Sequence, residues 1–196
     1  MDLFTSSMTD NQKLNDLKEK YKTLLEVEQN GKGKFNIIKG SKKNYGNCVL
    51  IILPNVTEAG FMHADHETQT LMCILDDYEI ENYIICYAQP AKCHSASRKT
   101  VKQSRQLMFD LIDITMPKFI ITCDEVSAEL FMNQKPNVIN AHGTVVCNYS
   151  NIPVILTYNA DYYVTRTGYE DDTYKKSILK EDWELIATTY KDLIKD

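Results

Sequence analysis

The sequence is poor in residues that interrupt regular structure, with seven glycines and five prolines among 196 residues. This composition excludes a fibrous or linker-rich protein. Apolar runs of the roughly 18 residues needed to span a bilayer are also lacking. The first ten residues contain no basic segment followed by an apolar one, so we expect neither a signal peptide nor a membrane partner. Hydrophobic residues make up 43% of the chain and charged residues 25%, which is typical of one globular domain.

Paired cysteines are lacking as well. The six cysteines stand singly at positions 48, 73, 86, 93, 123 and 147, and no Cys-x-x-Cys motif exists. Several lie in apolar runs, so we interpret them as free thiols in a reducing compartment and expect a cytoplasmic protein. Metal or cluster ligation is the alternative. The sequence also has no Walker loop, dinucleotide fingerprint or Ser-x-x-Lys motif, which leaves those common enzyme classes without support.

Acidic residues are absent from two long stretches, residues 29–57 and 82–109. Basic residues gather in both stretches: Lys32, Lys34, Lys39, Lys42 and Lys43 in the first, and Lys92, Arg98, Lys99, Lys102 and Arg105 in the second. The net charge of −5 argues against nucleic acid as a partner of the whole surface. The two basic stretches nevertheless favour a local surface that faces phosphates, with ordinary solvated faces as the alternative.

Alternating strand and helix patterns predict an α/β protein. The apolar runs Cys48–Leu53, Tyr83–Ala88, Lys118–Cys123 and Val154–Tyr158 are typical of parallel strands that are buried on both faces. Helical periodicity predicts helices between them at Glu67–Tyr78, Lys99–Thr115 and Glu125–Met132, the last with Asp124 as its N-cap. We therefore expect a single three-layer domain around a central, mainly parallel four-stranded sheet.

Further elements complete the expected domain. Helices are predicted at Asp10–Glu28 and Lys180–Ile194, and short strands at Phe35–Ile38 and Thr144–Cys147. Residues 1–47 would form an N-terminal helix and a basic loop, and residues 48–196 the sheet core. The polar segments Pro54–Asp65, Gln89–Ser97 and Asn159–Tyr174 follow predicted strands. In α/β proteins such loops, at the carboxyl ends of strands, are where ligands usually bind.

Three segments carry a family resemblance. The first has Pro117-Lys118 before the strand Ile120-Ile121-Thr122 and the helix start Glu125-Val126-Ser127-Ala128. The second has His142-Gly143 followed by Asn151-Ile152-Pro153-Val154 and Thr157-Tyr158, and the third is Trp183 in the last helix. Together, from roughly Cys48 to the C-terminus, they resemble the uracil-DNA glycosylase superfamily, nearest its four-cysteine iron–sulfur class. The resemblance implies that family's fold and a base-binding pocket at Asn55, Phe61, Cys86 and Asn159.

The residues that would carry the family's chemistry differ here. The family's water-activating acid maps onto Pro54, and the asparagine that pairs with the uracil edge maps onto Cys86. The histidine that stabilises charge on the departing uracil maps onto Asn159, which cannot become cationic. Two of the family's cluster ligands lie near the N-terminus, and no cysteine precedes Cys48. We therefore predict no iron–sulfur cluster and no other cofactor.

The preferred hypothesis is a glycosylase-like protein that has lost uracil excision and acts as a DNA- or protein-binding module. Its setting would be DNA replication or repair, encoded by a virus and located in the host cytoplasm. The DNA backbone would contact Lys39, Lys42, Lys43, Lys92, Arg98, Lys99, Lys102 and Arg166. A protein partner is also expected, and the acidic loop Glu170–Asp172 offers one contact surface. The rival hypothesis is an unorthodox glycosylase that uses Asn55, Glu58, Asp65 or Asn159.

Two histidine-containing motifs have alternative interpretations. His63, Asp65, His66 and Glu67 could bind a metal, but their position at a helix start favours Asp65 as an N-cap with solvent-facing histidines. Asp65 could also act as a general base in an unorthodox glycosylase. His142, directly before Gly143, is interpreted as a turn residue rather than a catalytic residue.

Overall fold

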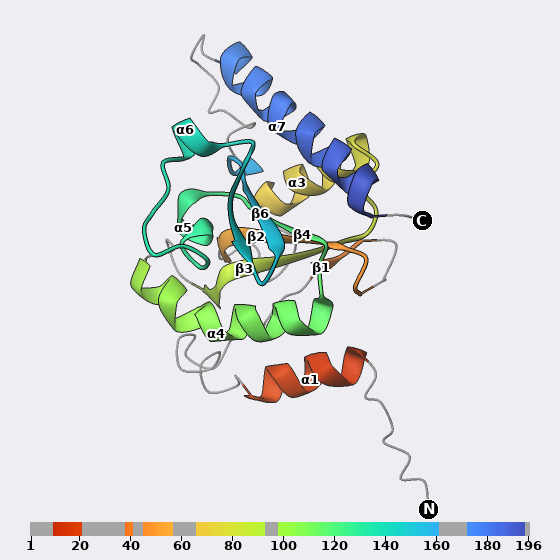
Figure 1. Ribbon diagram of the computed structural model, residues 1–196, viewed down its shortest axis with the longest axis vertical. Coiled ribbons are helices and arrows are strands. Elements are labelled where there is room, and N and C mark those ends of the chain that lie inside the picture. The colour runs from red at the N-terminus through yellow and green to blue at the C-terminus, as the bar shows by residue number, and fades with distance from the viewer. Residues whose placement is uncertain are drawn as a thin grey trace, which may run out of the picture.

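The computed structural model describes residues 10–20, 38–40, 45–56, 66–92, 98–160 and 172–194. Within these ranges the chain forms an α/β fold in which one sheet lies between two layers of helices (Figure 1). This confirms the predicted class and the mainly parallel sheet. The predicted strand Phe35–Ile38 lies almost wholly outside these ranges, as do the end of the first predicted helix and most of the loop before the last helix.

Four parallel strands form the centre of the sheet, in the order β3-β2-β4-β6. They are β2 (Val49–Val56), β3 (Tyr83–Lys92), β4 (Phe119–Thr122) and β6 (Ile152–Leu156). Two antiparallel strands border them: β1 (Ile38–Lys39) on β3, and β5 (Thr144–Tyr149) on β6. The four-strand prediction is therefore not confirmed for the whole sheet, which has six strands in the described ranges.

Helices cover both faces of the sheet because its central strands are apolar on both sides. On one face lie α3 (His66–Asp77) and α7 (Asp172–Leu193), and on the other α1 (Asp10–Lys20) and α4 (Arg98–Thr115) (Figure 1). The short helices α5 (Glu125–Ala128) and α6 (Val138–Ala141) follow β4. Along β2 the side chains alternate between the two cores, with Ile51 facing α3 and α7 and Ile52 facing α4.

The connections define a reversal of strand order between β2 and β4. The chain leaves β2 through α3 on one face to reach β3, and then returns through α4 on the other face to β4, on the far side of β2. In open α/β sheets, ligands bind in the crevice outside the carboxyl ends of the strands at such a reversal. We call this side of the sheet, where β2, β3, β4 and β6 end, the carboxyl edge.

Two strands extend farther toward this edge than predicted. Pro54–Val56 belongs to β2 and Gln89–Lys92 to β3, although both segments were predicted to be loops. Asn55 pairs with Gln89, and the next residue, Val56, pairs with Lys92, so Pro90 and Ala91 form a bulge. Bulges bend strands and re-aim side chains, and they are frequent next to functional sites. Pairing between the strands has overridden the local signal of the two prolines.

Candidate functional site

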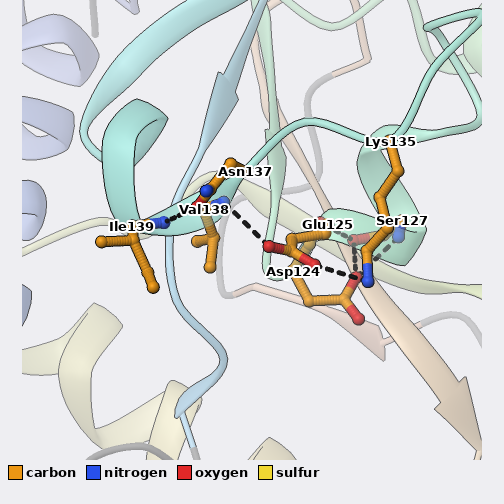
Figure 2. A network of polar contacts seen from close by, with 7 residues as sticks. All are labelled: Asp124, Glu125, Ser127, Lys135, Asn137, Val138 and Ile139. Atoms are coloured by element: carbon orange, nitrogen blue, oxygen red, sulfur yellow. Dashed lines mark hydrogen bonds and ion pairs between the residues drawn. The ribbon is translucent and has the colours of Figure 1, made fainter.

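Asp124 marks the carboxyl end of β4, beside the reversal point. Its carboxylate caps α5 by accepting hydrogen bonds from the Ser127 backbone N–H and hydroxyl, both at 2.6 Å (Figure 2). This confirms the predicted N-cap. Burial raises the pKa of Asp124, while the hydrogen bonds from Ser127 and the charge of Lys135 act in the opposite direction. The carboxylate is therefore occupied by the helix start and holds the β4–α5 connection in place.

The neighbouring Glu125 connects α5 to α6. Its carboxylate forms an ion pair with Lys135 at 2.5 Å and accepts a hydrogen bond from the Val138 backbone N–H at 3.0 Å (Figure 2). Asn137 caps α6, with its side-chain oxygen accepting from the Ile139 N–H at 3.0 Å. These contacts fix α6, whose C-cap is His142. A polar network thus positions His142 from the end of β4.

His142 forms a polar triad with the buried side chains of Thr157 and Asp182. The imidazole Nδ1 lies 2.8 Å from Asp182 Oδ1, and the Thr157 hydroxyl donates to Asp182 Oδ2 at 2.7 Å. Thr157 follows β6 directly, so the triad stands at the carboxyl edge. The Tyr158 ring lies beside it, with its centroid 5.1 Å from that of the imidazole. A carboxylate that fixes one imidazole nitrogen while leaving the other free is the arrangement that orients a histidine for proton transfer or ligand contact.

Asp182 and Thr157 are both buried, and His142 is the most accessible member of the triad. The Asp182 side chain is 3% exposed, against 23% for His142. Burial raises the pKa of Asp182, while the hydrogen bonds from His142 and Thr157 lower it. A buried carboxylate is unfavourable unless it is hydrogen-bonded, and here each oxygen has a donor. The triad therefore depends on all three side chains.

Gly143 allows the backbone to pass directly over Asp182. Its φ is +67°, and a Cβ at this position would lie 2.5 Å from Asp182 Oδ1. The Gly143 N–H donates to the Leu156 carbonyl at 2.8 Å, which places this glycine at the start of the β5–β6 pairing. As predicted, His142 lies at a turn, where it is the C-cap of α6, and its ring also contacts Asp182 of α7.

A sequence signal for this triad existed at Asp182. Leu179, Trp183 and Ile186 are buried against the sheet at helical spacing, and Asp182 falls on the same stripe. A carboxylate on the apolar face of a helix is rare unless it is paired. Its partner could not be read from the sequence, because His142 lies 40 residues away.

The residues predicted to form a base-binding pocket lie at different depths along the sheet, and one of them lies outside the described ranges. Asn55 is at the end of β2, and Asn159 follows β6 by three residues and is half-buried, so both belong to the carboxyl edge. Cys86 lies deeper, in register with Ile52, and is fully buried. Its Sγ lies 3.8 Å from Met108 Sδ in the core under α4, and burial raises the pKa of the thiol. Glu58, Phe61 and Asp65 lie outside the described ranges.

The basic residues predicted to contact DNA divide between the two ends of the sheet. Lys92 ends β3, and Arg98, Lys99 and Lys102 belong to the first turns of α4, so these four lie at the carboxyl edge. Lys39 pairs with Ile84, near the opposite end of β3. Lys42, Lys43 and Arg166 lie outside the described ranges.

Arg105, from the same basic stretch, makes internal contacts. Its guanidinium donates to the Leu130 carbonyl at 2.5 Å and to the Glu129 and Met132 carbonyls at 3.5 Å, and it lies over the Phe109 ring. Arg105 therefore secures the segment after α5, which explains part of the basic stretch without a phosphate.

The described residues contain no group of three His, Cys, Asp or Glu side chains that could hold a metal ion. His63 and Asp65, from the possible metal-binding group of the sequence, lie outside these ranges. Of the cysteines with described positions, Cys48, Cys86 and Cys123 are buried, Cys147 is half-buried, Cys73 is exposed, and all are free. None of the described helices is both long enough and apolar enough to cross a membrane.

A scan against protein-family models and a search of curated proteins both return no match for this chain. The family resemblance therefore rests on the three sequence segments alone.

Proposed function

We propose that this chain is a uracil-DNA glycosylase-like domain that binds single-stranded DNA at the carboxyl edge and does not excise uracil. The segments behind the resemblance occur in the expected order: Pro117-Lys118 precedes β4, His142-Gly143 precedes β5, and Thr157-Tyr158 follows β6. The third segment, Trp183, is buried in α7. These placements and the four parallel strands support the proposal. In this proposal the domain serves DNA replication or repair, alongside a protein partner.

The observation that carries the binding proposal is the start of α4. This 18-residue helix begins at the carboxyl edge with Arg98, Lys99 and Lys102 and has no acidic residue in its first turn. The partial positive charge of a helix N-terminus adds to the charge of these side chains, and together they favour a phosphate. Lys92 ends the strand that leads to this helix.

Two observations support loss of the reaction. The position of the family's catalytic acid is taken by Pro54, a buried strand residue without an ionisable group. The position of the base-pairing asparagine is taken by Cys86, whose thiol is enclosed in the core. The second candidate, excision by Asn55, Glu58, Asp65 or Asn159, is favoured by one observation, which is that Asn55 and Asn159 share the carboxyl edge.

The binding proposal predicts that Arg98→Glu combined with Lys102→Glu weakens binding of a fluorescent single-stranded oligonucleotide. Fluorescence anisotropy should show a loss of at least tenfold at 50 mM salt. The slope of log affinity against log salt should fall in magnitude by about 1.4, since each phosphate contact to a single strand contributes about 0.7.

The matched control is Lys118→Glu combined with Lys191→Glu. It makes the same charge change on two exposed lysines at the opposite end of the sheet, where Lys118 precedes β4 and Lys191 pairs with Glu79 at 3.9 Å. This control should keep most of the affinity. Equal losses in the two double variants would show that binding depends only on net charge and would contradict a site at the carboxyl edge.

A further inference from the structure

In the described part of the chain, the His142 imidazole forms a hydrogen bond through Nδ1 and none through Nε2. One oxygen of the Asp182 carboxylate accepts a hydrogen bond from the His142 Nδ1–H, and the other accepts one from the Thr157 hydroxyl. The carboxylate therefore cannot rotate without losing a hydrogen bond. The acceptor at Nδ1 favours the tautomer that carries its proton there. Any ligand contact by this ring is therefore made through Nε2.

The His142 ring lies between the buried Asp182 carboxylate and the protein surface. Asp182 is nearly inaccessible, whereas about a quarter of the His142 side chain is exposed. When the ring gains its second proton, at Nε2, it becomes positively charged. Its Nδ1 then lies 2.8 Å from the Asp182 carboxylate, which compensates this charge. Among the described residues, the titratable groups facing His142 are Asp182 from α7 and Tyr158 after β6, and Glu181 acts on Asp182.

The triad stands at the same edge as the start of α4. Thr157 follows β6, whereas α4 follows β3, and these two strands are three positions apart in the sheet. At about 4.8 Å for each strand spacing, the ends of β3 and β6 are about 14 Å apart within the sheet, and α4 and α7 lie on opposite faces of it. A single strand of DNA that contacts both must cross the ends of all four parallel strands.

We propose that His142, held by Asp182, is a phosphate-binding residue whose protonated Nε2 donates a hydrogen bond to an anionic phosphate oxygen. This inference rests on the proposed function for its natural ligand, the phosphodiester backbone of a single strand. The reaction involved is a protonation equilibrium: the ring gains one proton at Nε2 and binds the anion as imidazolium.

The direct test is ¹H–¹⁵N NMR of the imidazoles in the full chain, with the His142 signals assigned by their loss in His142→Gln. We expect protonation at Nδ1 in the free protein and a shift of the His142 nitrogens toward the imidazolium values when a thymidine 12-mer is added at neutral pH. In Asp182→Asn this shift should shrink, because the compensating charge is gone. Inorganic phosphate, added alone, shows whether the site takes a free anion as well as a DNA phosphate.

The affinity for the 12-mer separates a ligand contact from a structural contact. His142→Gln should bind the 12-mer about tenfold more weakly than the unaltered protein. Thr157→Val is the matched control, since it removes a hydrogen bond to Asp182 but keeps the histidine. This variant should lower stability and keep the affinity. A purely structural triad would instead lower stability in both variants and leave the affinity unchanged in both.

The outcomes for the two proposals are distinct. DNA binding without any shift of the His142 nitrogens overturns this inference and leaves the proposed function standing. A shift with inorganic phosphate but no DNA binding supports the phosphate site and overturns the proposed function. No shift with either ligand overturns the inference.

Discussion

Replacing Gly143 by alanine is expected to lower the free energy of unfolding by about 3 kcal/mol. The backbone at Gly143 has a φ of +67°, a region that costs an L-residue about 1 kcal/mol. The added Cβ would also lie 2.5 Å from Asp182 Oδ1. Asp182 cannot move away without losing its contacts to His142 and Thr157, so the rest of the loss comes from a disrupted triad.

Gly46→Ala is the matched control for this prediction. Gly46 has a φ of +79°, and a Cβ there would meet nothing within 4 Å. This variant should therefore show the backbone strain alone, about 1 kcal/mol. Urea unfolding of the two variants measures the difference. Equal losses of stability would mean that Asp182 is free to move and that the triad is loosely held.

Cys86→Asn is expected to destabilise the protein by about 3 kcal/mol rather than to create a base-binding site. The family resemblance makes this substitution attractive, because it introduces the asparagine that the uracil-DNA glycosylase superfamily has at the matching position. In the structure, however, position 86 is fully buried among apolar side chains, with Met108 as its sulfur contact. An amide at this place must give up its hydrogen bonds to water.

The control is Cys73→Asn, on the exposed side of α3. It should change the free energy of unfolding by no more than about 0.5 kcal/mol. The comparison also tests the position of the pocket, since a ligand cavity at position 86 would accept the amide without a large penalty. If both variants unfold at the same urea concentration, the placement of Cys86 in the core is wrong.

The central elements were predictable because their signals are local. The apolar runs around Ile51, Ile85, Ile121 and Ile155 predicted the four parallel strands, since strands covered on both faces need apolar residues at every position. The periodicity of α3 and α4 gave those helices almost residue for residue. The N-cap at Asp124 was predicted for the same reason, as a cap depends on the next three residues only.

The elements that were missed depend on contacts from distant parts of the chain. The four residues of α6 give no periodic signal, and the helix start is held by Glu125 from α5. The first residues of α7, from Asp172 onward, are polar and were predicted as loop, although a helix readily extends over polar residues once it is nucleated. The strand at Pro54–Val56 exists because β3 continues beside it.

In the candidate site, too, the features with local sequence signals were predicted, and those that depend on distant contacts were not. The sequence indicated the carboxyl edge as the place for a ligand, and it indicated the basic residues that begin α4. It did not reveal the pairing of His142 with Asp182, because no local pattern connects two residues 40 positions apart. The pocket predicted around Cys86 came from a match of positions in strand order, which does not determine how deeply a side chain is buried.

The central claim is that the carboxyl edge binds single-stranded DNA and leaves uracil in place. The most direct measurement incubates the protein with a uracil-containing single strand, records binding by anisotropy, and then treats the same sample with alkali to cleave any abasic site. We predict saturable binding and no strand cleavage above the level of an Asn159→Ala control. Cleavage above that control would contradict the loss of uracil excision, and an absence of binding would contradict the DNA-binding surface.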